Sequence, residues 1–545
     1  MVEITRRVDG IPLAIEFAAA RVSHLTPADI AVRLDDMFRL LTGGRRRVQR
    51  QQTLKAALDW SYELLTDAER QLLQCLAVFN GGAYLDAVEA IWSDSGEVLA
   101  RDAVLDMLGS LVAKSLVIAQ RSPEHVRYHL LETVRQYAAD ELRANGSPGL
   151  FRSRHVEHYS AWLRSIPLVR SYFDIATWML VDRERDNLRS AMTWSVEQDR
   201  PELAAHIASL MFTLGYANVF SEEARRWLLG GLERLDGLEP LDRQAVLAAL
   251  ATAEMLAGDG NPVGLARRAV EVDLGNTEPG GAACVAHTLL STLLAAQAQA
   301  SASTDQADQS HAAGVRALDI AGRLDDPAWT GWAWQGRGNA DLIRGDMTAA
   351  AQAYESAIEY WAASTCTHPT HIALLGLAVA LHISGDGEGA TRAVDAMDAL
   401  DVAASKLHAR GPGEPMSWTA MARTLTLTAA HDLKGARTAL AEALRSIERS
   451  VSRPRDATLV TAAVVALEIG DGERASRLLA AATTFDRRPE RTFFIRSQWG
   501  FVLYRHYLPI VRASLTPDIA RRCRAEGAAM STSDAMAHAW ELTVV

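Results

Sequence analysis

Apolar residues recur at helical spacing along most of the chain, and the alternation that is typical of strands is confined to one short stretch. Thr66 is a suitable N-cap, and Asp67 and Glu69 follow it in a first helical turn. The pattern predicts helices over residues 53–65, 67–78, 85–92, 100–113 and 132–143, and strands over residues 116–120 and 126–130. Helices followed by a two-stranded hairpin predict a winged-helix domain.

Beyond residue 150, Ala- and Leu-rich helical patterns alternate with turns of small residues. Four turns share an aspartate that follows glycine or histidine, precedes an alanine by four residues, and recurs at spacings of 40, 46 and 39 residues. The turns are Gly345-Asp346, Gly385-Asp386, His431-Asp432 and Gly470-Asp471, and the alanines are Ala350, Ala390, Ala436 and Ala475, with a weaker copy at Gly258-Asp259 and Ala266. The pattern resembles degenerate tetratricopeptide repeats, which implies an α-solenoid whose concave face binds a protein partner or a small-molecule signal.

Together these patterns predict a mainly α protein with a helical segment, a winged-helix domain and a tetratricopeptide-like α-solenoid. We expect residues 1–50 to form the first helical segment and residues 53–145 the winged helix. Residues 150–530 are expected to form the helical array, and residues 531–545 a C-terminal tail. The polar residues 301–310 are expected to form a loop within the array.

A helix-break-helix corner is predicted near the start of the chain, at Gly10-Ile11-Pro12-Leu13-Ala14. Gly10 tolerates backbone angles that other residues resist, and Pro12 fixes its own φ and disfavours a helical Ile11. A new helix therefore begins near Pro12. These residues resemble the GLPLA motif of the NB-ARC, or STAND, family of regulatory ATPases.

The resemblance continues in three further blocks, at residues 34–44 with 50–62, at residues 76–82 and at residues 128–138, and covers about residues 1–145. It is closest to the actinobacterial branch that joins such ATPases to LuxR-type or AfsR-type transcriptional regulators. Residues 523–539 resemble the segment that precedes the helix-turn-helix domain of LuxR-type members.

The resemblance implies three functional properties. In the family, the proline and its neighbours lie against bound adenine nucleotide, so Gly10, Pro12 and Leu13 would keep a vestigial nucleotide contact. ATP or ADP would be the cofactor of full-length relatives. The winged helix would be an intramolecular lid that closes over the nucleotide.

Parts of the family pattern are missing from this chain. The phosphate-binding string GxxxxGK[ST] does not occur in the sequence. Leu131 stands where the family usually has the histidine that senses the diphosphate, although Glu132 and Arg135 keep the acid and the base of that pattern. We therefore expect the middle part of a larger regulator, without the ATPase core or the terminal helix-turn-helix, with no catalytic residue and no cofactor of its own.

Composition and charge argue against several classes of function. The formal net charge of −11 argues against nucleic-acid binding by the whole molecule, because such binding depends on neutralising phosphates. The longest apolar stretch, residues 372–381, is too short to cross a bilayer, so no membrane association is expected. The four cysteines form no CxxC pair, which favours the cytoplasm and argues against a zinc ribbon.

Two groups of side chains contain residue types that bind metal ions. Cys366, His368 and His371 lie close in sequence, but Pro369 is among them and no fourth ligand is near. His155 and His158 share a helix face without a carboxylate partner. The sequence therefore favours no metal site.

One dense basic patch allows an alternative function. Its cations are Arg45, Arg46, Arg47 and Arg50. Contact with DNA or an acidic partner is one interpretation, but a solvated linker is favoured because no aromatic residues alternate with the arginines. Within the winged helix, residues 102–114 offer only Lys114 as a cation, which favours a lid over a DNA-binding domain.

The array contains a tryptophan cluster, Trp329, Trp332 and Trp334, for which core packing is favoured over recognition. The sequence as a whole predicts a non-catalytic, signal-responsive regulatory protein. The alternatives are a DNA-binding protein that acts through its winged helix, and a scaffold or decayed fragment without ATPase activity.

Overall fold

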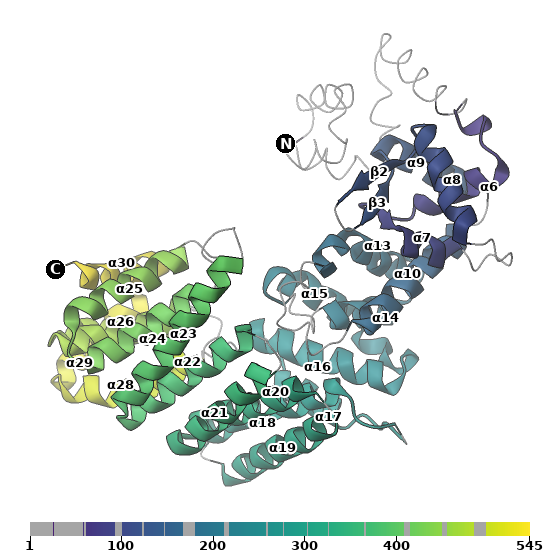
Figure 1. Cartoon of the computed structure of the whole chain (residues 1–545). Coiled ribbons are helices and arrows are strands. Elements are labelled where there is room, and N and C mark those ends of the chain that lie inside the picture. The colour runs from purple at the N-terminus through teal and green to yellow at the C-terminus, as the bar shows by residue number, and fades with distance from the viewer. Residues whose placement is uncertain are drawn as a thin grey trace. The chain divides into compact units, whose positions relative to one another are not determined.

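The structure is a computed structural model of the 545-residue chain (Figure 1). The residues that it describes are 26, 58, 61–92, 101–122, 125–145, 148–166, 180–211, 217–257, 260–275, 277–301, 303–324, 326–363, 367–407, 415–448, 455–483 and 498–544. The predicted corner at Gly10, Pro12 and Leu13 lies outside the described residues, and so does the basic patch of residues 45–50.

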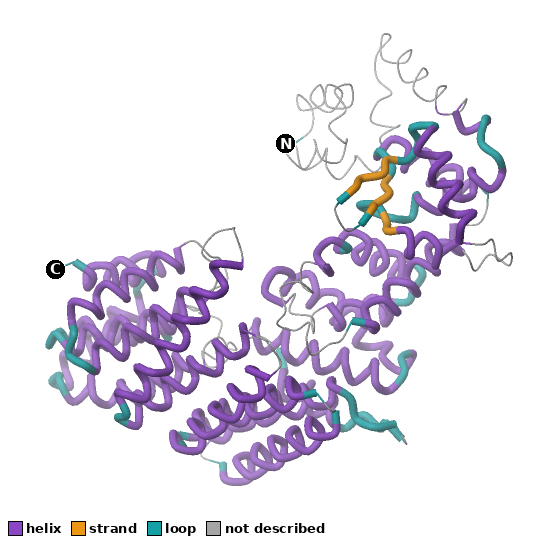
Figure 2. Tube along the Cα trace, viewed as in Figure 1, coloured by secondary structure: helices purple, strands orange, loops and turns teal. Residues whose placement is uncertain are grey.

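The chain divides into two compact units. The first holds the described residues up to Ser165 together with Leu180–Ile207, and the second holds Ile166 and the described residues from Ala208 onward. In the described part of the chain, strands form one three-stranded sheet, which lies in the first unit (Figure 2). The fold class is therefore mainly α, as predicted.

The first unit contains the predicted winged helix. Its elements are α6 (Asp67–Leu76), β1 (Ala83–Tyr84), α7 (Leu85–Trp92), α8 (Arg101–Ala113), β2 (Ile118–Arg121), β3 (Val126–His129) and α9 (Glu132–Ala144). β1 and β2 both pair antiparallel with β3, so that Ala83 and Ala119 lie on opposite sides of Tyr128. These elements confirm the predicted helices over residues 67–78, 85–92, 100–113 and 132–143 and both predicted strands to within a few residues. The predicted helix over residues 53–65 lies mostly outside the described residues. β1 has no counterpart among the predictions, because two residues are too few to show an alternating pattern.

A capping box begins α6. The Glu69 backbone N–H donates to the Thr66 hydroxyl at 3.3 Å, and the Thr66 backbone N–H donates to Glu69 Oε2 at 2.8 Å. The predicted N-cap at Thr66 is thus confirmed. The helix that it starts buries Leu72 and Leu73 completely in the core of the winged helix.

The other described helices follow the winged helix in the chain. They are α10 (Pro148–Ser165), α13 (Arg185–Glu197), α14 (Pro201–Met211), α15 (Ala217–Gly231), η3 (Leu232–Gly237), α16 (Pro240–Ala257), α17 (Pro262–Val270), α18 (Gly281–Ser301), α19 (Thr304–Arg323), α20 (Pro327–Arg344), α21 (Met347–Ala363), α22 (Thr367–Ser384), α23 (Gly387–Leu407), α24 (Pro415–Ala429), α25 (Leu433–Glu448), α26 (Arg455–Glu468), α27 (Gly472–Ala482), α28 (Gln498–Ala513), α29 (Pro517–Ala529), α30 (Thr532–Trp540) and η4 (Glu541–Thr543).

Two helices that were expected in the array pack instead with the winged helix. α10 contacts α7 and α9, and α13 contacts α10. Glu184, just before α13, accepts hydrogen bonds from Arg127 of β3 and, at 2.7 Å, from the Tyr159 hydroxyl of α10. Asn187 donates to Glu184 at 2.6 Å and to the Gly82 carbonyl at 3.0 Å. Because this buried network crosses residue 150, the first compact unit extends beyond the boundary that the sequence suggested.

In the second unit, neighbouring helices form pairs: α18 with α19, α20 with α21, α22 with α23, α24 with α25, and α26 with α27 (Figure 1). The first helices of successive pairs also contact one another, α18 with α20, α20 with α22, α22 with α24, and α24 with α26. Helix pairs that stack in this way form a tetratricopeptide-like solenoid.

All four predicted aspartate turns lie at junctions within these pairs. The residue before each aspartate has a left-handed backbone, with φ of 90° at Gly345, 86° at Gly385, 58° at His431 and 83° at Gly470. Each aspartate then caps the next helix, because the N–H three residues later donates to its carboxylate at 2.8 to 3.0 Å. The alanines after the turns are fully buried. In the weaker copy, Ala266 is also fully buried, and residues 258–259 lie outside the described part.

The loop prediction for residues 301–310 was wrong. Residues 304–310 form the first turns of α19, whose N-cap Ser303 accepts a hydrogen bond from the Gln306 N–H at 3.3 Å. Serine, threonine and aspartate favour helix N-caps as much as loops, so composition alone gave the wrong result. Ser310 is fully buried and exchanges hydrogen bonds of 2.7 and 2.8 Å with Ser291.

The segment 531–545, expected as a tail, contains a packed helix. α30 contacts α25, α26 and α27, and its residues Ala535 and Ala539 are fully buried. A capping box between Ser531 and Asp534 begins this helix. The described residues of this segment therefore belong to the array.

One described helix, α18, is long and apolar enough to cross a membrane by length and composition. Its segment Gly281–Gln299 has a mean hydropathy of 1.3, and 61% of it is buried. α18 contacts α16, α17, α19 and α20, as a core helix of a solenoid does. Core helices of soluble proteins often have this length and composition, so these two properties are weak support for a membrane span.

The histidine in one turn allows a direct test of the turn geometry. His431→Gly should stabilise the α24–α25 pair by about 1 kcal/mol, because a left-handed backbone costs a residue with a side chain about 1–2 kcal/mol. The contact between the His431 ring and Glu468 is also lost, but it is exposed and adds little stability. Amide hydrogen exchange in these helices should slow about fivefold. Gly470→Ala should have the opposite effect on α26 and α27, because it places a side chain on a left-handed backbone. The added Cβ would meet no atom within 4 Å, so no steric clash contributes to the effect. Unchanged exchange in both variants would contradict the turn model.

Candidate functional site

The outward face of α8 is the first candidate surface. α8 precedes the hairpin of the winged helix, the position of the helix that enters a DNA groove in helix-turn-helix proteins. Its outward residues include Leu105, which is 46% exposed, Asp106 and Gly109. An apolar and acidic face is a poor match for phosphate oxygens and a better match for another protein surface.

Lys114 follows α8, and its ammonium group is paired within the domain. Its Nζ donates to both carboxylate oxygens of Glu69, at 2.7 and 2.8 Å, and the Ser110 hydroxyl donates to the same carboxylate at 2.6 Å. Burial raises the pKa of Glu69, but hydrogen bonds from Lys114, Ser110 and the Thr66 backbone outweigh this effect and lower that pKa to about 2. Lys114 thus compensates a buried carboxylate.

The hairpin contributes two further cations, and their environments differ. Arg121, at the end of β2, is exposed. Arg127, on β3, is half-buried and donates to the carbonyls of Gly81 and Gly82 at 2.9 and 3.1 Å as well as to Glu184. Gly82 has a φ of 85°, and a Cβ there would lie 2.6 Å from the Tyr128 carbonyl oxygen. The glycines therefore fix the hairpin to the rest of the unit.

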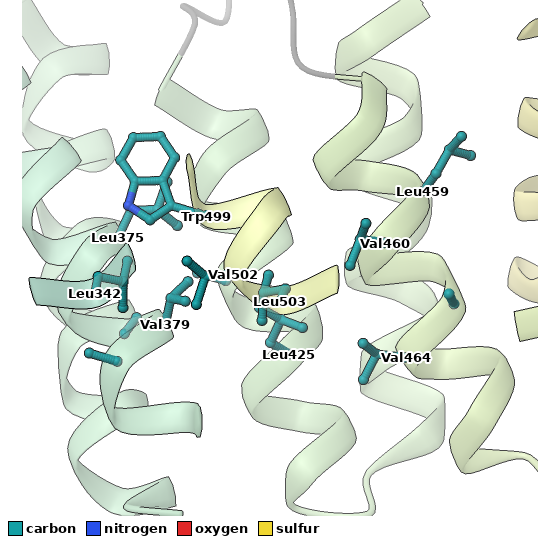
Figure 3. Packing of buried hydrophobic residues seen from close by; sticks show 14 of the residues in the cluster. Leu342, Leu375, Val379, Leu425, Leu459, Val460, Val464, Trp499, Val502 and Leu503 are labelled. Atoms are coloured by element: carbon teal, nitrogen blue, oxygen red, sulfur yellow. The ribbon is translucent and has the colours of Figure 1, made fainter. Parts of the chain in front are cut away.

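The second candidate surface is the inner face of the array, which we define as the side of α18, α20, α22, α24 and α26 that contacts α28. Its apolar side chains form one core cluster with those of α28. Figure 3 shows Trp499, Val502 and Leu503 of α28 beside Leu342, Leu375, Val379 and Leu425 of the array. A helix of the same chain thus lies against the face that a solenoid offers to partners.

The metal-site candidates are not brought together in the described residues. Cys366 lies outside them, and the side chain of His368 is not described. His371 is buried, with its Nε2 2.9 Å from the Thr419 hydroxyl and its Nδ1 3.7 Å from Asp401 Oδ1. In the described part of the chain, no group of three or more His, Cys, Asp or Glu residues could hold a metal ion.

His155 and His158 have packing roles in the first unit. The His155 ring lies 5.3 Å from that of Phe79 and 4.7 Å from that of Tyr159. Burial lowers the pKa of His155 to about 3, and burial also lowers the pKa of His158. Both rings are therefore neutral near pH 7.

The other predicted positions have structural environments. Arg135 donates to Glu132 at 2.7 Å within the first turn of α9, next to Leu131 at its N-cap. Trp329, Trp332 and Trp334 are partly buried against the core clusters of the array, which agrees with a packing role. The nucleotide candidates Gly10, Pro12 and Leu13 and the arginines Arg45, Arg46, Arg47 and Arg50 lie outside the described residues.

Comparison with known proteins identifies the class of the first domain. A family model described as "Winged helix-turn-helix domain" matches residues 65–143, which extend from the start of α6 nearly to the end of α9. The match agrees with the observed order of helices and strands.

The chain is similar to two proteins of Mycobacterium tuberculosis. One, the "Putative HTH-type transcriptional regulator Rv0890c", is 44% identical over 232 residues, which are 42% of this chain and 26% of that protein. The other, "Uncharacterized protein Rv0894", is 41% identical over 157 residues, which are 29% of this chain and 40% of that protein. The matched part of this chain thus spans well under half of either relative.

Two solved structures align with most of the chain at low similarity. A Signal Transduction ATPase with Numerous Domains protein with a tetratricopeptide repeat sensor, from Pyrococcus horikoshii, aligns with a TM-score of 0.42 at 14% identity, over 92% of this chain and 73% of that one. The APC/C hetero-tetramer Cut9-Hcn1 aligns with a TM-score of 0.34 at 15% identity, over 96% and 95%.

Replacing Lys114 tests the electrostatics of the winged helix. Lys114→Met should destabilise the first unit by about 1–2 kcal/mol at pH 7, because it removes charge-assisted hydrogen bonds from a buried carboxylate while Lys114 itself is partly exposed. Folding lowers the pKa of Glu69. This stabilisation is therefore complete above about pH 4.5 and is lost as the pH falls through about 2.

Urea denaturation at several pH values would measure the effect. The difference between the variant and the original protein should shrink between pH 4.5 and pH 2. Lys434→Met, at an exposed lysine, is the matched control and should change stability by less than about 0.5 kcal/mol. A Lys114→Met effect that is equally large at both ends of the range would argue against the pairing.

Proposed function

We propose that the chain is a non-catalytic, signal-responsive regulatory protein whose winged helix contacts protein and whose helical array binds a partner or ligand. The observation that carries the proposal is the chemistry of the exposed side chains on and beside α8. Lys114 is paired with the buried Glu69, while Leu105 and Asp106 face outward. Similarity to a protein named as a transcriptional regulator supports the regulatory class, and the activity of a whole regulator is part of the proposal because the match spans 26% of that relative.

In this proposal, the winged helix is the lid of a STAND-type regulator. Leu105 of α8 is 46% exposed and Ile118 of β2 is 38% exposed, and a covering protein surface would remove both from water. The nucleotide would belong to full-length relatives, with Gly10, Pro12 and Leu13 as a vestigial contact. The absence of a GxxxxGK[ST] string from the sequence supports a chain that does not hydrolyse ATP.

The cytoplasm is the proposed compartment. Of the four cysteines in the sequence, the three that are described, Cys75, Cys284 and Cys523, are free and buried. Burial raises the pKa of Cys75 and Cys284 to about 12, so both thiols stay protonated and unreactive. Free buried thiols are typical of proteins in reducing compartments.

DNA binding through the winged helix is the second candidate function. It is favoured by the match to a winged helix-turn-helix model and by the exposed Arg121 at the tip of the hairpin. The arginines at residues 45–47 and 50 could add phosphate contacts. It is less favoured than the lid because α8 presents no free cation among its described side chains.

A titration with duplex DNA separates these two functions. We expect the full chain to bind labelled duplex no more tightly than about 10⁻⁵ M at about 50 mM salt, as for weak non-specific contacts. Fluorescence anisotropy at several salt concentrations would measure this. The control replaces all four arginines, Arg45→Gln, Arg46→Gln, Arg47→Gln and Arg50→Gln. Tight binding whose salt slope falls by about three to four in this variant would establish DNA binding instead.

A nucleotide assay tests the non-catalytic part of the proposal. We expect phosphate release from ATP in the presence of the full chain to equal that in buffer, because no phosphate-binding loop is encoded. Micromolar ATP binding with hydrolysis would overturn the proposal. A Pro12→Ala variant is the specificity control, since loss of such binding in it would assign the nucleotide to the corner at residues 10–14.

A further inference from the structure

α28 departs from the pairing that the other helices of the array follow. In the preceding pairs, the second helix packs along the first. α29 instead packs along α27, and α28 contacts α20, α22, α26 and α27. α28 and α29 make too few contacts to form a pair of the usual kind. Among the described helices, α28 is thus placed against the inner face rather than beside its successor.

Side-chain contacts extend this placement across the whole inner face. The Trp499 ring of α28 packs edge to face on the Trp418 ring of α24, with centroids 4.9 Å apart. The Tyr507 hydroxyl and His382 Nε2 of α22 are hydrogen-bonded at 2.6 Å. Arg505 donates a hydrogen bond to Gln299 of α18. Together with its backbone neighbours α20 and α26, α28 touches the first helix of every pair from α18 to α26.

The buried side of α28 has the spacing of a helix that docks into a groove. Trp499, Val502 and Leu503 are 7%, 6% and 1% exposed, and they occupy positions i, i+3 and i+4 (Figure 3). Ile510 near the other end is 44% exposed. Recognition of amphipathic helices by hydrophobic grooves uses anchors at this spacing.

The helices that follow α28 have contacts of their own with the array. α29 packs on α27, and α30 packs on α25, α26 and α27, so neither is attached to the array through α28 alone. Pro509 lies inside α28 and removes one helical hydrogen bond within the docked segment, which continues to the buried Val511. The helix is therefore weakened inside its docked segment.

We propose that α28 is an internal competitor for the partner-binding face of the array, and that the partner is a protein presenting an amphipathic helix with an aromatic residue followed by aliphatic residues three and four positions later. This proposal rests on the proposed function, in that the array binds a protein partner. A tethered segment acts at an effective concentration of about millimolar, so a partner binds with reduced apparent affinity until α28 is displaced.

The test uses the full chain and a fluorescent synthetic peptide of residues 498–508. The original chain should bind the peptide weakly, because α28 occupies the face. A Leu503→Asp chain, in which α28 cannot dock well, should bind it at least about tenfold more tightly. Ile510→Asp, on the exposed side of the same helix, is the matched control and should behave as the original chain. A peptide carrying the Leu503→Asp change should fail to bind any chain.

A milder variant keeps the proposal testable if the Leu503→Asp chain does not fold. Arg505→Ala combined with Tyr507→Phe removes the polar contacts to Gln299 and His382 and keeps the apolar anchors. It should raise peptide affinity about threefold, with unchanged circular dichroism. If this folded variant and a folded Leu503→Asp chain both bind no more tightly than the original chain, α28 is a fixed part of the core and the proposal is overturned.

The outcome is separable from that of the proposed function. Tight DNA binding or ATP hydrolysis would end the proposed function and leave the peptide result, which concerns only the inner face, unaffected. Failure of the peptide to bind would end the competitor proposal and leave the DNA and nucleotide tests unaffected.

Discussion

Close packing at small residues is the interaction on which the helical array depends. Tyr354 of α21 is fully buried, and its ring fills the space beside Gly338 of α20 and Gly376 of α22, where an added Cβ would lie 2.9 and 2.3 Å from ring atoms. The turn alanines serve the same purpose where paired helices cross. Since each pair of a solenoid contacts only its neighbours, a side chain that separates two helices would also misplace the next pair and the inner face.

Local chemistry in the sequence was sufficient for much of the fold. Thr66 and the aspartates of the four turns cap helices through bonds to residues three positions away, so their roles could be read from short motifs. Contacts between distant residues had no such signal. Ser310 pairs with Ser291 on another helix, and Glu184 joins β3 to α10 and α13. The first contact lies in a segment that was predicted as a loop and is a helix. The second extends the first unit beyond residue 150.

The candidate surfaces also combine features that the local sequence shows with contacts between distant residues that it does not show. The sequence identified Lys114 as the lone cation of residues 102–114, but its partner Glu69 lies 45 residues away and could not be inferred from spacing. The apolar residues of α28 have the period of any amphipathic helix, and nothing local distinguishes a helix that pairs with its successor from one that lies on the inner face. The position of Trp499 beside Trp418 is a property of the folded array.

In both candidate surfaces, groups that could meet a partner are already engaged by the chain, but the energetic consequences differ. Separating Lys114 from Glu69 leaves a buried carboxylate without its cation and destabilises the winged helix, so this pair is a fixed feature of the domain. In the proposed exchange, removing α28 would expose apolar side chains that an equivalent helix covers again, so that the cost of opening is recovered on binding. A two-state exchange of this kind needs an occupant and a competitor of similar stability. We therefore propose the array, rather than α8, as the element that switches.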